Sequence, residues 1–197
     1  MSDELPIYIL AAGASTRLGR PKQLVTIAGE PLLRRQCRIA LDAALGPVTV
    51  VLGCHAESCA ATITDLPVCT LLSTDWVEGL AASLRVATRD AQDRQAPALL
   101  VLQCDQFRIT ADDLRLLYRA WTHSGNAVRA VHDAYRGPPV MLPEACFAGM
   151  LELHGDQGAR GVLAKLDPAR VAEVACPNAI FDLDLPEHLA LLDATRQ

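Results

Sequence analysis

The sequence predicts an α/β fold in which helices cover both faces of a mostly parallel β-sheet. Short apolar segments of strand length alternate along the chain with longer segments whose apolar residues recur on one helical face. The short segments are almost free of polar residues, as strands buried on both faces are. Strands that alternate with amphipathic helices are typical of parallel sheets. The 197 residues are enough for one domain of this kind.

The first half of the chain has the pattern of a Rossmann-like sheet. Apolar, strand-length runs predict strands at residues 7–11, 48–52, 68–72 and 99–103. Helical periodicity predicts helices at residues 31–45, 55–65 and 77–93, and a fourth helix that carries Leu114, Leu117, Tyr118 and Trp121 on one face. Thr110 is expected to cap the N-terminus of that fourth helix. In such sheets ligands bind beyond the carboxyl ends of the strands.

The pattern changes after residue 125. A helix–loop–helix is expected at residues 143–166, and Pro186 is expected to open a final helix. Further strands are predicted at residues 128–132, 140–142, 171–174 and 180–183, with a turn at residues 137–139. The chain contains no internal repeat, low-complexity segment or linker. We therefore interpret residues 1–197 as a single domain with two halves, about 1–106 and 107–197.

Composition excludes several classes of function. The formal net charge is −5 and no basic run occurs, so generic binding of nucleic acid by phosphate neutralisation is not expected. No apolar segment is long enough to predict a membrane span, and the first residues lack the basic start of a signal peptide. A cytoplasmic location follows as the expectation. The seven cysteines lack CxxC spacing and are expected to be reduced, mostly as small core residues.

The strongest local signal is the segment LAAGASTRLGRPK at residues 10–22. A loop of small residues after a strand exposes successive backbone N–H groups, which bind anions. Gly13 allows a ligand to approach the main chain closely. Arg17 and Lys22 add two positive charges, and Arg20 is either a third or a solvent residue. This arrangement predicts a polyphosphate ligand, although the segment matches neither the Walker A motif nor the dinucleotide fingerprint.

Acidic residues supply a candidate metal site. Asp105 follows the strand at 99–103 and is expected at the ligand edge of the sheet, although a turn or cap role is also open. Asp182 and Asp184 are two residues apart on an extended segment and share a face. One or both are expected to meet Asp105 around Mg²⁺, which accepts carboxylate oxygens together with phosphates and waters. For Asp184, capping of the final helix is the alternative.

A second Gly-containing loop, GDQGAR at residues 155–160, carries Arg160. A guanidinium there is suited to bidentate binding of a phosphate on a second substrate. The alternative is a flexible turn that caps a helix.

These motifs together resemble a known family. The Gly loop followed by Arg and Pro-Lys resembles the signature of the nucleotidyltransferase superfamily. Nearly the whole chain resembles the MobA-like family, and most closely its molybdenum cofactor cytidylyltransferases (MocA-like). The further segments that carry this resemblance are GLAASL at 79–84, CDQ at 104–106, RGPPV at 136–140, GDQGAR at 155–160 and DLDLPE at 182–187.

The resemblance implies a three-layer α/β/α fold of the GT-A-like type and transfer of CMP from CTP to a molybdopterin-type cofactor, with release of pyrophosphate. It implies a nucleotide-binding first half, an acceptor-side second half and a Mg²⁺ or Mn²⁺ ion held by Asp105 and Asp182. Arg17, Lys22 and Asp105 are its implied catalytic residues. The implied substrate-binding residues are Leu10, Ala11, Ala12, Gly13, Arg17, Lys22, Ser83, Gly155, Asp156 and Arg160.

Two departures from the family pattern leave the acceptor open. Pro138 stands where the family often has His, and Leu185 stands where it often has Thr. CTP is favoured over GTP because residues 10–13 are closer to the cytidylyl branch. The alternatives are a nucleotidyltransferase of the same fold that uses another nucleoside triphosphate and a sugar phosphate, and a non-catalytic carrier of the cofactor. A molybdoenzyme that receives the product is a further partner that the resemblance suggests.

Overall fold

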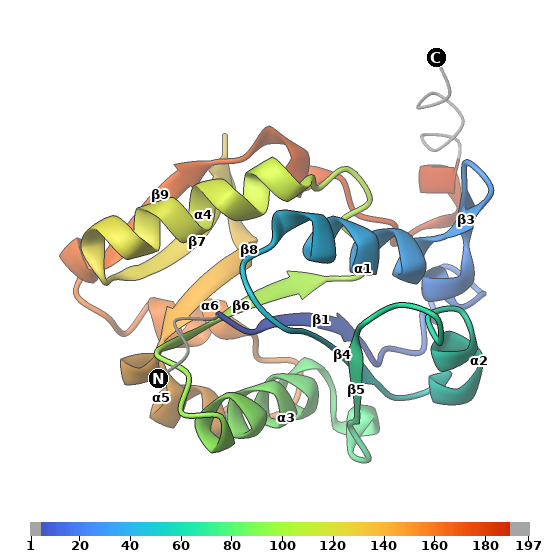
Figure 1. The fold of residues 1–197 in the computed structure, drawn as a ribbon, viewed down its shortest axis with the longest axis horizontal. Coiled ribbons are helices and arrows are strands. Elements are labelled where there is room, and N and C mark those ends of the chain that lie inside the picture. The colour runs from blue at the N-terminus through green and yellow to red at the C-terminus, as the bar shows by residue number, and fades with distance from the viewer. Residues whose placement is uncertain (1–4, 190–197) are drawn as a thin grey trace.

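The computed structural model describes residues 5–189 and contains one large mixed sheet. Its seven strands lie in the order β5-β4-β1-β6-β8-β7-β9 (Figure 1). The strands β1, β4, β5 and β6 are mutually parallel, β9 is parallel to β7, and β8 is antiparallel to both β6 and β7. The strand bounds are β1 Ile7–Ala11, β4 Val48–Leu52, β5 Cys69–Leu72, β6 Ala98–Gln103, β7 Ala127–His132, β8 Tyr135–Pro143 and β9 Val171–Ala175. A two-stranded hairpin, β2 Thr26–Ile27 and β3 Glu30–Pro31, precedes the first helix.

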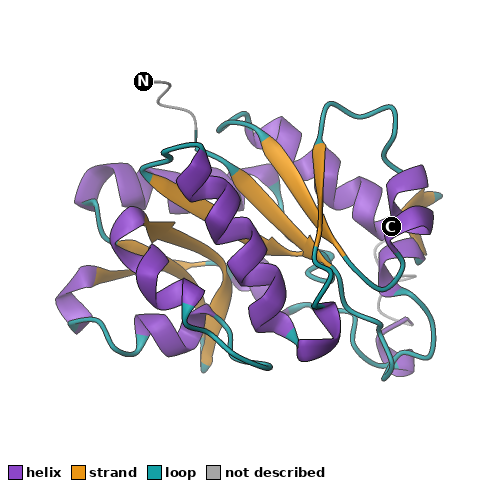
Figure 2. Ribbon diagram, turned by 90° about the horizontal axis from the view of Figure 1, so that it is seen from below, coloured by secondary structure: helices purple, strands orange, loops and turns teal. Residues whose placement is uncertain are grey.

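Helices cover both faces of this sheet and complete three layers. One layer contains α1 Leu32–Ala43, α2 Ala56–Ala61 and α4 Ala111–Ser124. The other contains α3 Leu80–Asp93, α5 Phe147–Leu151 and α6 Ala159–Leu163. In Figure 1, α1 and α4 lie above the sheet and α3 and α5 below it, and Figure 2 shows the lower layer in front of the strands. The predicted three-layer architecture with a mostly parallel sheet is confirmed.

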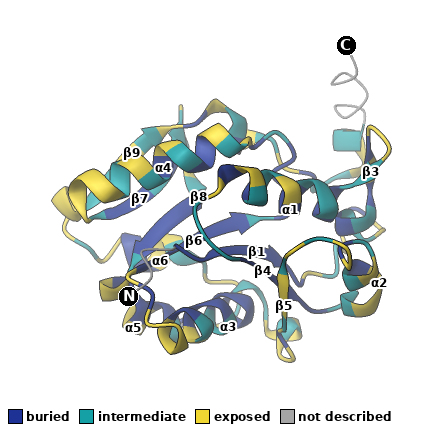
Figure 3. Ribbon diagram, viewed as in Figure 1, coloured by how far each residue is buried: buried dark blue, intermediate teal, exposed yellow. Residues whose placement is uncertain are grey.

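The central strand β1 shows why the sheet needs two helix layers. All five of its residues are buried. Ile7, Ile9 and Ala11 belong to the core on the α1 and α4 side, whereas Tyr8 and Leu10 belong to the core on the α3 side. Successive side chains of a strand point to opposite faces, so a fully apolar strand requires cover on both. The central strands are accordingly buried along their length (Figure 3).

Three predicted elements differ from the structure. The predicted turn at 137–139 lies inside β8, and the chain reverses instead at residues 133 and 134. The predicted strand at 180–183 is wrong: Pro177–Ile180 form a 3₁₀ helix, and the extended residues that follow pair with no strand in the described structure. Pro177 opens that turn because proline fits its first position. The predicted helix at 77–93 begins only at Leu80, because Gly79 has a φ of 121° after a 3₁₀ turn at Trp76–Glu78.

Other local predictions are confirmed. Thr110 caps α4, where its hydroxyl accepts a hydrogen bond from the N–H of Asp113 and the Asp113 carboxylate accepts one from the N–H of Thr110. Pro186 begins a 3₁₀ helix at Pro186–His188, and the rest of the predicted final helix lies outside the described residues. All seven cysteines are thiols, and burial raises the pKa of Cys37 to about 12. None of the helices in the described residues is both long and apolar enough to cross a lipid bilayer.

Candidate active site

A cavity of about 530 Å³, here called the first cavity, lies at the carboxyl ends of β1 and β6. This edge is where parallel α/β sheets bind ligands. Its walls come from four segments that are far apart in the sequence. They are the loop after β1 (residues 12–22, here called the Gly loop), the turn before α3, the end of β6 and the extended segment at residues 182–184.

The Gly loop presents a row of free backbone donors. Within residues 5–189, the N–H groups of Ala12, Gly13 and Ala14 donate to no protein acceptor. The carbonyls of Ala11 and Gly13 are turned the other way, because both accept hydrogen bonds from Gln23 Nε2, at 2.9 and 2.8 Å. In a trans peptide the C=O and N–H point in opposite directions. The N–H groups of Ala12 and Ala14 therefore point away from Gln23, and both residues line the cavity.

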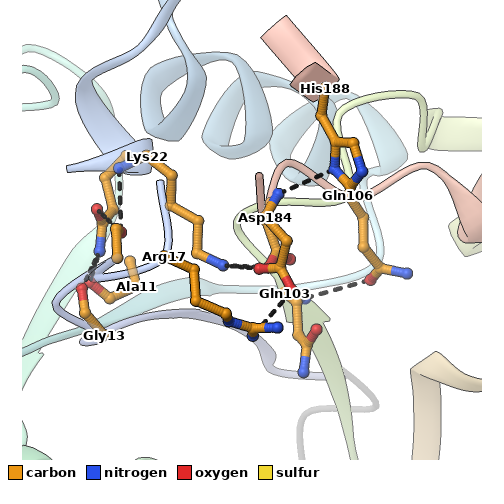
Figure 4. Close-up of polar contacts among 11 residues, drawn as sticks. Ala11, Gly13, Arg17, Lys22, Gln103, Gln106, Asp184 and His188 are labelled. Atoms are coloured by element: carbon orange, nitrogen blue, oxygen red, sulfur yellow. Dashed lines mark hydrogen bonds and ion pairs between the residues drawn. The ribbon is translucent and has the colours of Figure 1, made fainter. Parts of the chain in front are cut away.

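Two cations of the Gly loop form ion pairs with carboxylates that line the same cavity, and Figure 4 shows Arg17 and Lys22 beside Asp184. Lys22 Nζ lies 2.5 Å from Asp105 Oδ2 and 3.0 Å from Asp184 Oδ1, and Arg17 Nη2 lies 2.9 Å from Asp184 Oδ2. Burial lowers the pKa of Lys22, but the two carboxylates outweigh it and leave the pKa above its ordinary value. Burial likewise opposes ionisation of Asp184, yet Lys22 and Arg17 bring its pKa below the ordinary value. The predicted residues Arg17, Lys22 and Asp105 thus meet in one ion-pair network.

The carboxylates also fit a divalent cation. Asp105 Oδ1 is buried and has no hydrogen-bond partner in the described structure, so this oxygen is available as a ligand. Burial raises the pKa of Asp182, and the nearby charges of Asp105 and Asp184 raise it further. A surplus of negative charge on oxygen donors is the chemistry that Mg²⁺ or Mn²⁺ prefers. Among residues 5–189, no group of three or more His, Cys, Asp or Glu side chains is arranged to hold a metal ion by itself.

The role left open for Asp184, capping of the final helix, is not observed in the described residues. Its carboxylate pairs with Lys22 and Arg17, and its backbone N–H donates to Nδ1 of His188. The residue at the N-terminus of the 3₁₀ helix Pro186–His188 is Leu185, which makes no side-chain cap.

Another wall of the first cavity joins the turn before α3 to the second Gly-containing loop. The N–H of Gly155 donates to Glu78 Oε1 at 3.1 Å, and the N–H of Ala81 donates to the carbonyl of Gly155 at 3.0 Å. A Cβ on Gly79 would overlap the carbonyl of Gly155, so only glycine allows this approach. Asp156 is thereby held at the first cavity, while Gly155 itself contributes the backbone bonds and does not line it.

A second cavity, of about 260 Å³, adjoins the first. Its lining is mostly apolar and includes three arginines. Arg129 and Arg136 both pair with Glu173, whereas Arg160 has no ion-pair partner among the described residues. The two cavities share part of their lining, namely Leu10, Leu80, Gln103 and Asp182.

The structure brings most of the predicted site residues to the first cavity. Arg160 lies in the second cavity instead, and the optional third cation Arg20 is exposed and lines neither. Sequence reasoning missed Gln23 as a site residue, although it follows Lys22 directly in the motif. The predicted residues at the first cavity are Leu10, Ala11, Ala12, Gly13, Arg17, Lys22, Ser83, Asp105, Asp156 and Asp182.

The fold and the site together are typical of α/β proteins that bind nucleotides. The features that indicate this class are the backbone donors of the Gly loop, the carboxylates beside it and the topology of the sheet. The chain belongs to the MobA-like NTP transferase domain family, whose model matches residues 7–171.

Individual proteins show the same relationship. The chain is 29% identical over 192 residues to the purine catabolism protein PucB of Bacillus subtilis, with 90% of each chain covered. It is 34% identical over 125 residues to a phosphoenolpyruvate guanylyltransferase of Rubrobacter xylanophilus, covering 59% of this chain and 58% of the relative. Its fold is similar to that of Rv0371c from Mycobacterium tuberculosis, with a TM-score of 0.84, 25% identity and 96% of each chain covered. Another structure of Rv0371c is described as a complex with manganese.

Proposed function

We propose that this protein transfers CMP from CTP to the phosphate of a molybdopterin-type cofactor and releases pyrophosphate. The observation that carries the transferase proposal is the juxtaposition, in one cavity, of the free N–H groups of the Gly loop with Lys22 and Asp105. Those donors suit a triphosphate. The carboxylates beside them suit the metal ion that accompanies one.

The nucleotide is assigned to the first cavity and to the first half of the chain, about residues 1–106. The N–H groups of Ala12, Gly13 and Ala14 hold phosphate oxygens, and Arg17 and Lys22 neutralise charge on the departing pyrophosphate. Ser83 and Asp156, which also line the first cavity, are left to contact the nucleoside. Ser83 is buried on α3 and Asp156 is held in place by the bonds of its neighbour Gly155.

The acceptor is assigned to the second cavity and to the second half of the chain. Its apolar floor suits the flat body of a pterin better than a sugar, and the guanidinium of Arg160, which pairs with no carboxylate in residues 5–189, suits an anionic group. The residues common to both cavities bring the acceptor phosphate next to the nucleotide. An oxygen of that phosphate attacks the α-phosphorus in line, the bond to the pyrophosphate oxygen breaks, and no side chain is needed as a nucleophile.

Asp105 and Asp182 are the residues that would hold Mg²⁺ or Mn²⁺. Such an ion, when bound, neutralises charge on the reacting phosphates. The unpartnered Asp105 Oδ1 supports this assignment. Asp184 keeps Lys22 and Arg17 beside the phosphates through its two ion pairs.

CTP is proposed because residues 10–13 resemble the cytidylyl branch of the family. The names of similar proteins point to two acceptors. One relative is a phosphoenolpyruvate guanylyltransferase, and a protein of Archaeoglobus fulgidus with the same fold (17% identity, TM-score 0.72) is named for molybdopterin-guanine dinucleotide biosynthesis. The apolar second cavity favours the larger, flat acceptor. A transferase that uses GTP or another triphosphate with a small phosphate, and a non-catalytic carrier, are the competing proposals.

Pyrophosphate release tests these proposals in one assay. The purified protein is supplied with Mg²⁺, one of CTP, GTP, ATP or UTP, and one of molybdopterin cofactor, phosphoenolpyruvate or a sugar phosphate. The highest kcat/KM is expected for CTP with the molybdopterin cofactor. A higher value with GTP or with phosphoenolpyruvate contradicts the substrate assignment, and no release with any pair contradicts the transferase assignment. The wild-type reaction without acceptor and the Asp105→Asn variant serve as controls.

A further inference from the structure

A buried glutamine fixes the Gly loop. Gln23 is 1% exposed, and its Nε2 donates to the carbonyls of Ala11 and Gly13, as described above. Its Oε1 accepts a hydrogen bond from the Ser15 hydroxyl at 3.3 Å, and that hydroxyl accepts one from the N–H of Lys22 at 3.1 Å. One side-chain amide therefore closes the loop on itself and fixes which way its peptide groups face.

A second buried glutamine fixes the acceptor side in the same manner. Gln106 is also 1% exposed, and its Nε2 donates to the carbonyls of Pro138 at 2.7 Å and Ala179 at 3.0 Å. Its Oε1 accepts a weaker hydrogen bond from the N–H of Gln103 at 3.4 Å. The amide joins the end of β6, the strand β8 and the segment that leads to Asp182. Figure 4 shows the Gln106 side chain joined by a dashed line to Gln103.

The backbone next to Gln106 strengthens this link. The carbonyl of Asp105 accepts a hydrogen bond from the N–H of Leu183 at 3.0 Å. The Tyr135 hydroxyl donates to the carbonyl of Pro138 at 2.7 Å. Burial and the charges of Asp105 and Asp182 raise the pKa of Tyr135, so its hydroxyl keeps the proton that it donates. Hydrogen bonds of the backbone and of the Gln106 side chain therefore connect the segment that carries Asp105 to the segment that carries Asp182.

Building on the proposed function, we propose that Gln23 and Gln106 are positioning residues, Gln23 for the nucleotide and Gln106 for the acceptor. The two donors of each amide are engaged by backbone carbonyls, so neither amide is offered to the reacting atoms. Each acts through the main chain that it anchors: Gln23 through the N–H groups of the Gly loop, and Gln106 through the wall of the second cavity. Small displacements of groups that orient substrates reduce rates strongly.

A third buried glutamine provides a matched control. Gln36 is 0% exposed, and its Nε2 donates to the backbone carbonyl of Gln106 at 2.9 Å. It lies on α1 and lines neither cavity. The variants Gln23→Met, Gln106→Met and Gln36→Met each remove a buried amide and keep a side chain of similar length. Gln23→Met and Gln106→Met each remove two hydrogen bonds to backbone carbonyls of residues that line a cavity, whereas Gln36→Met removes one, to the carbonyl of Gln106, and leaves the Gln106 amide in place.

Steady-state kinetics with CTP and the molybdopterin cofactor separate the two roles. Gln23→Met should raise the KM for CTP about 10-fold and lower kcat while the KM for the acceptor stays within about 2-fold of wild type. Gln106→Met should show the reverse pattern, and Gln36→Met should leave both KM values near wild type. Equal changes in both KM values for any variant, or changes in Gln36→Met as large as in the others, overturn the proposal because general loosening of the core explains them.

Two milder variants cover a failure to fold. Ser15→Ala removes the hydrogen bonds of the Ser15 hydroxyl with Gln23 and with the N–H of Lys22. Tyr135→Phe removes the second donor to Pro138 and an acceptor for Gln106 Nε2, and it leaves the Gln106 amide in place. Ser15→Ala should raise mainly the KM for CTP, and Tyr135→Phe should raise mainly the KM for the acceptor, both by smaller factors. Equal changes in both KM values overturn the proposal. Calorimetric titration with Mg²⁺-CTP distinguishes this outcome from failure of the proposed function. If the wild-type protein binds no CTP and transfers no CMP, the proposed function has failed. If the wild type is active but no variant changes one KM value selectively, only the positioning roles have failed.

Discussion

The two cavities differ in how they are built. The first contains the charged Gly loop and the carboxylates, and much of its lining comes from one contiguous segment that contains the Gly loop and Lys22. The second is mostly apolar, and its lining comes from strands, helices and loops spread from Leu10 to Asp182. A contiguous loop carries its chemistry in a readable motif, whereas a pocket assembled by the fold does not. The nucleotide side is therefore the easier half to infer from sequence.

The largest expected effect lies at Asp105, a carboxylate of the first cavity. Asp105→Asn removes a charge while preserving shape, and kcat should fall about 10²-fold or more because charge stabilisation of the reacting phosphates is lost. Pyrophosphate release at saturating Mg²⁺ measures it. Asp112→Asn, at an exposed carboxylate of α4 that pairs with Arg115, is the matched control. Near-normal turnover of Asp105→Asn would remove this residue from the site.

Lys22→Ala tests whether the charge of the Gly loop acts in the transition state. We expect kcat and kcat/KM to fall together by about 10-fold or more, with KM for CTP much less changed, because an interaction made mainly in the transition state affects kcat. The exposed Lys165→Ala is the control. If Lys22 only attracts the nucleotide, KM alone rises and low ionic strength restores it. Kinetics at two salt concentrations decide between these outcomes.

Arg160→Ala sharpens the comparison because it should affect only the second cavity. Loss of a charged hydrogen bond should raise the KM for the acceptor about 10-fold and leave the KM for CTP unchanged. Arg119→Ala, at an exposed arginine on α4, is the control. A selective rise in the KM for CTP instead would place Arg160 with the nucleotide.

The smallest effect concerns stability without ligands. The raised pKa of Asp182 means that its charged form is disfavoured in the folded state. That penalty is present in full above the folded-state pKa and disappears as the pH falls below the ordinary value of 3.8. Asp182→Asn should therefore raise Tm at pH 7 in chelator, and the gain should shrink as the solution is acidified. A Tm at pH 7 equal to or below that of the wild type would contradict a destabilising charge on Asp182. Asp93→Asn, at an exposed carboxylate, is the control.

Sequence periodicity predicted most of the fold because the central strands are buried on both faces. The runs at residues 7–11 and 48–52 coincide with β1 and β4 without any shift. It failed at residues 180–183, where an extended apolar segment looks like a strand but packs beside the end of β6 without pairing. Such a segment is held by single hydrogen bonds, such as that from Leu183 to Asp105, which no local pattern reveals.

The site was predictable to the extent that its residues lie in motifs. Gly13, Arg17 and Lys22 all lie in the loop that follows one strand, so they are placed at the same end of the sheet. Lys22 pairs with Asp184 as well as with Asp105. The pairing with Asp184 could not be predicted from the sequence, because 162 residues separate the two partners. The roles of Gln23 and Gln106 were hidden for a different reason. A glutamine has no preferred meaning in a sequence until the carbonyls that it binds are known.

The shared lining of the two cavities has a consequence for product release. A product of the proposed reaction carries a nucleotide part and an acceptor part on one covalent frame, so it occupies both cavities as a bivalent ligand. When one part detaches, the other keeps it at a high effective concentration near its subsite, and rebinding competes with escape. The wall formed by Leu10, Leu80, Gln103 and Asp182 would then make departure of the product the slow step of turnover. A recipient protein that binds one part of the product first would speed this release and receive the product directly.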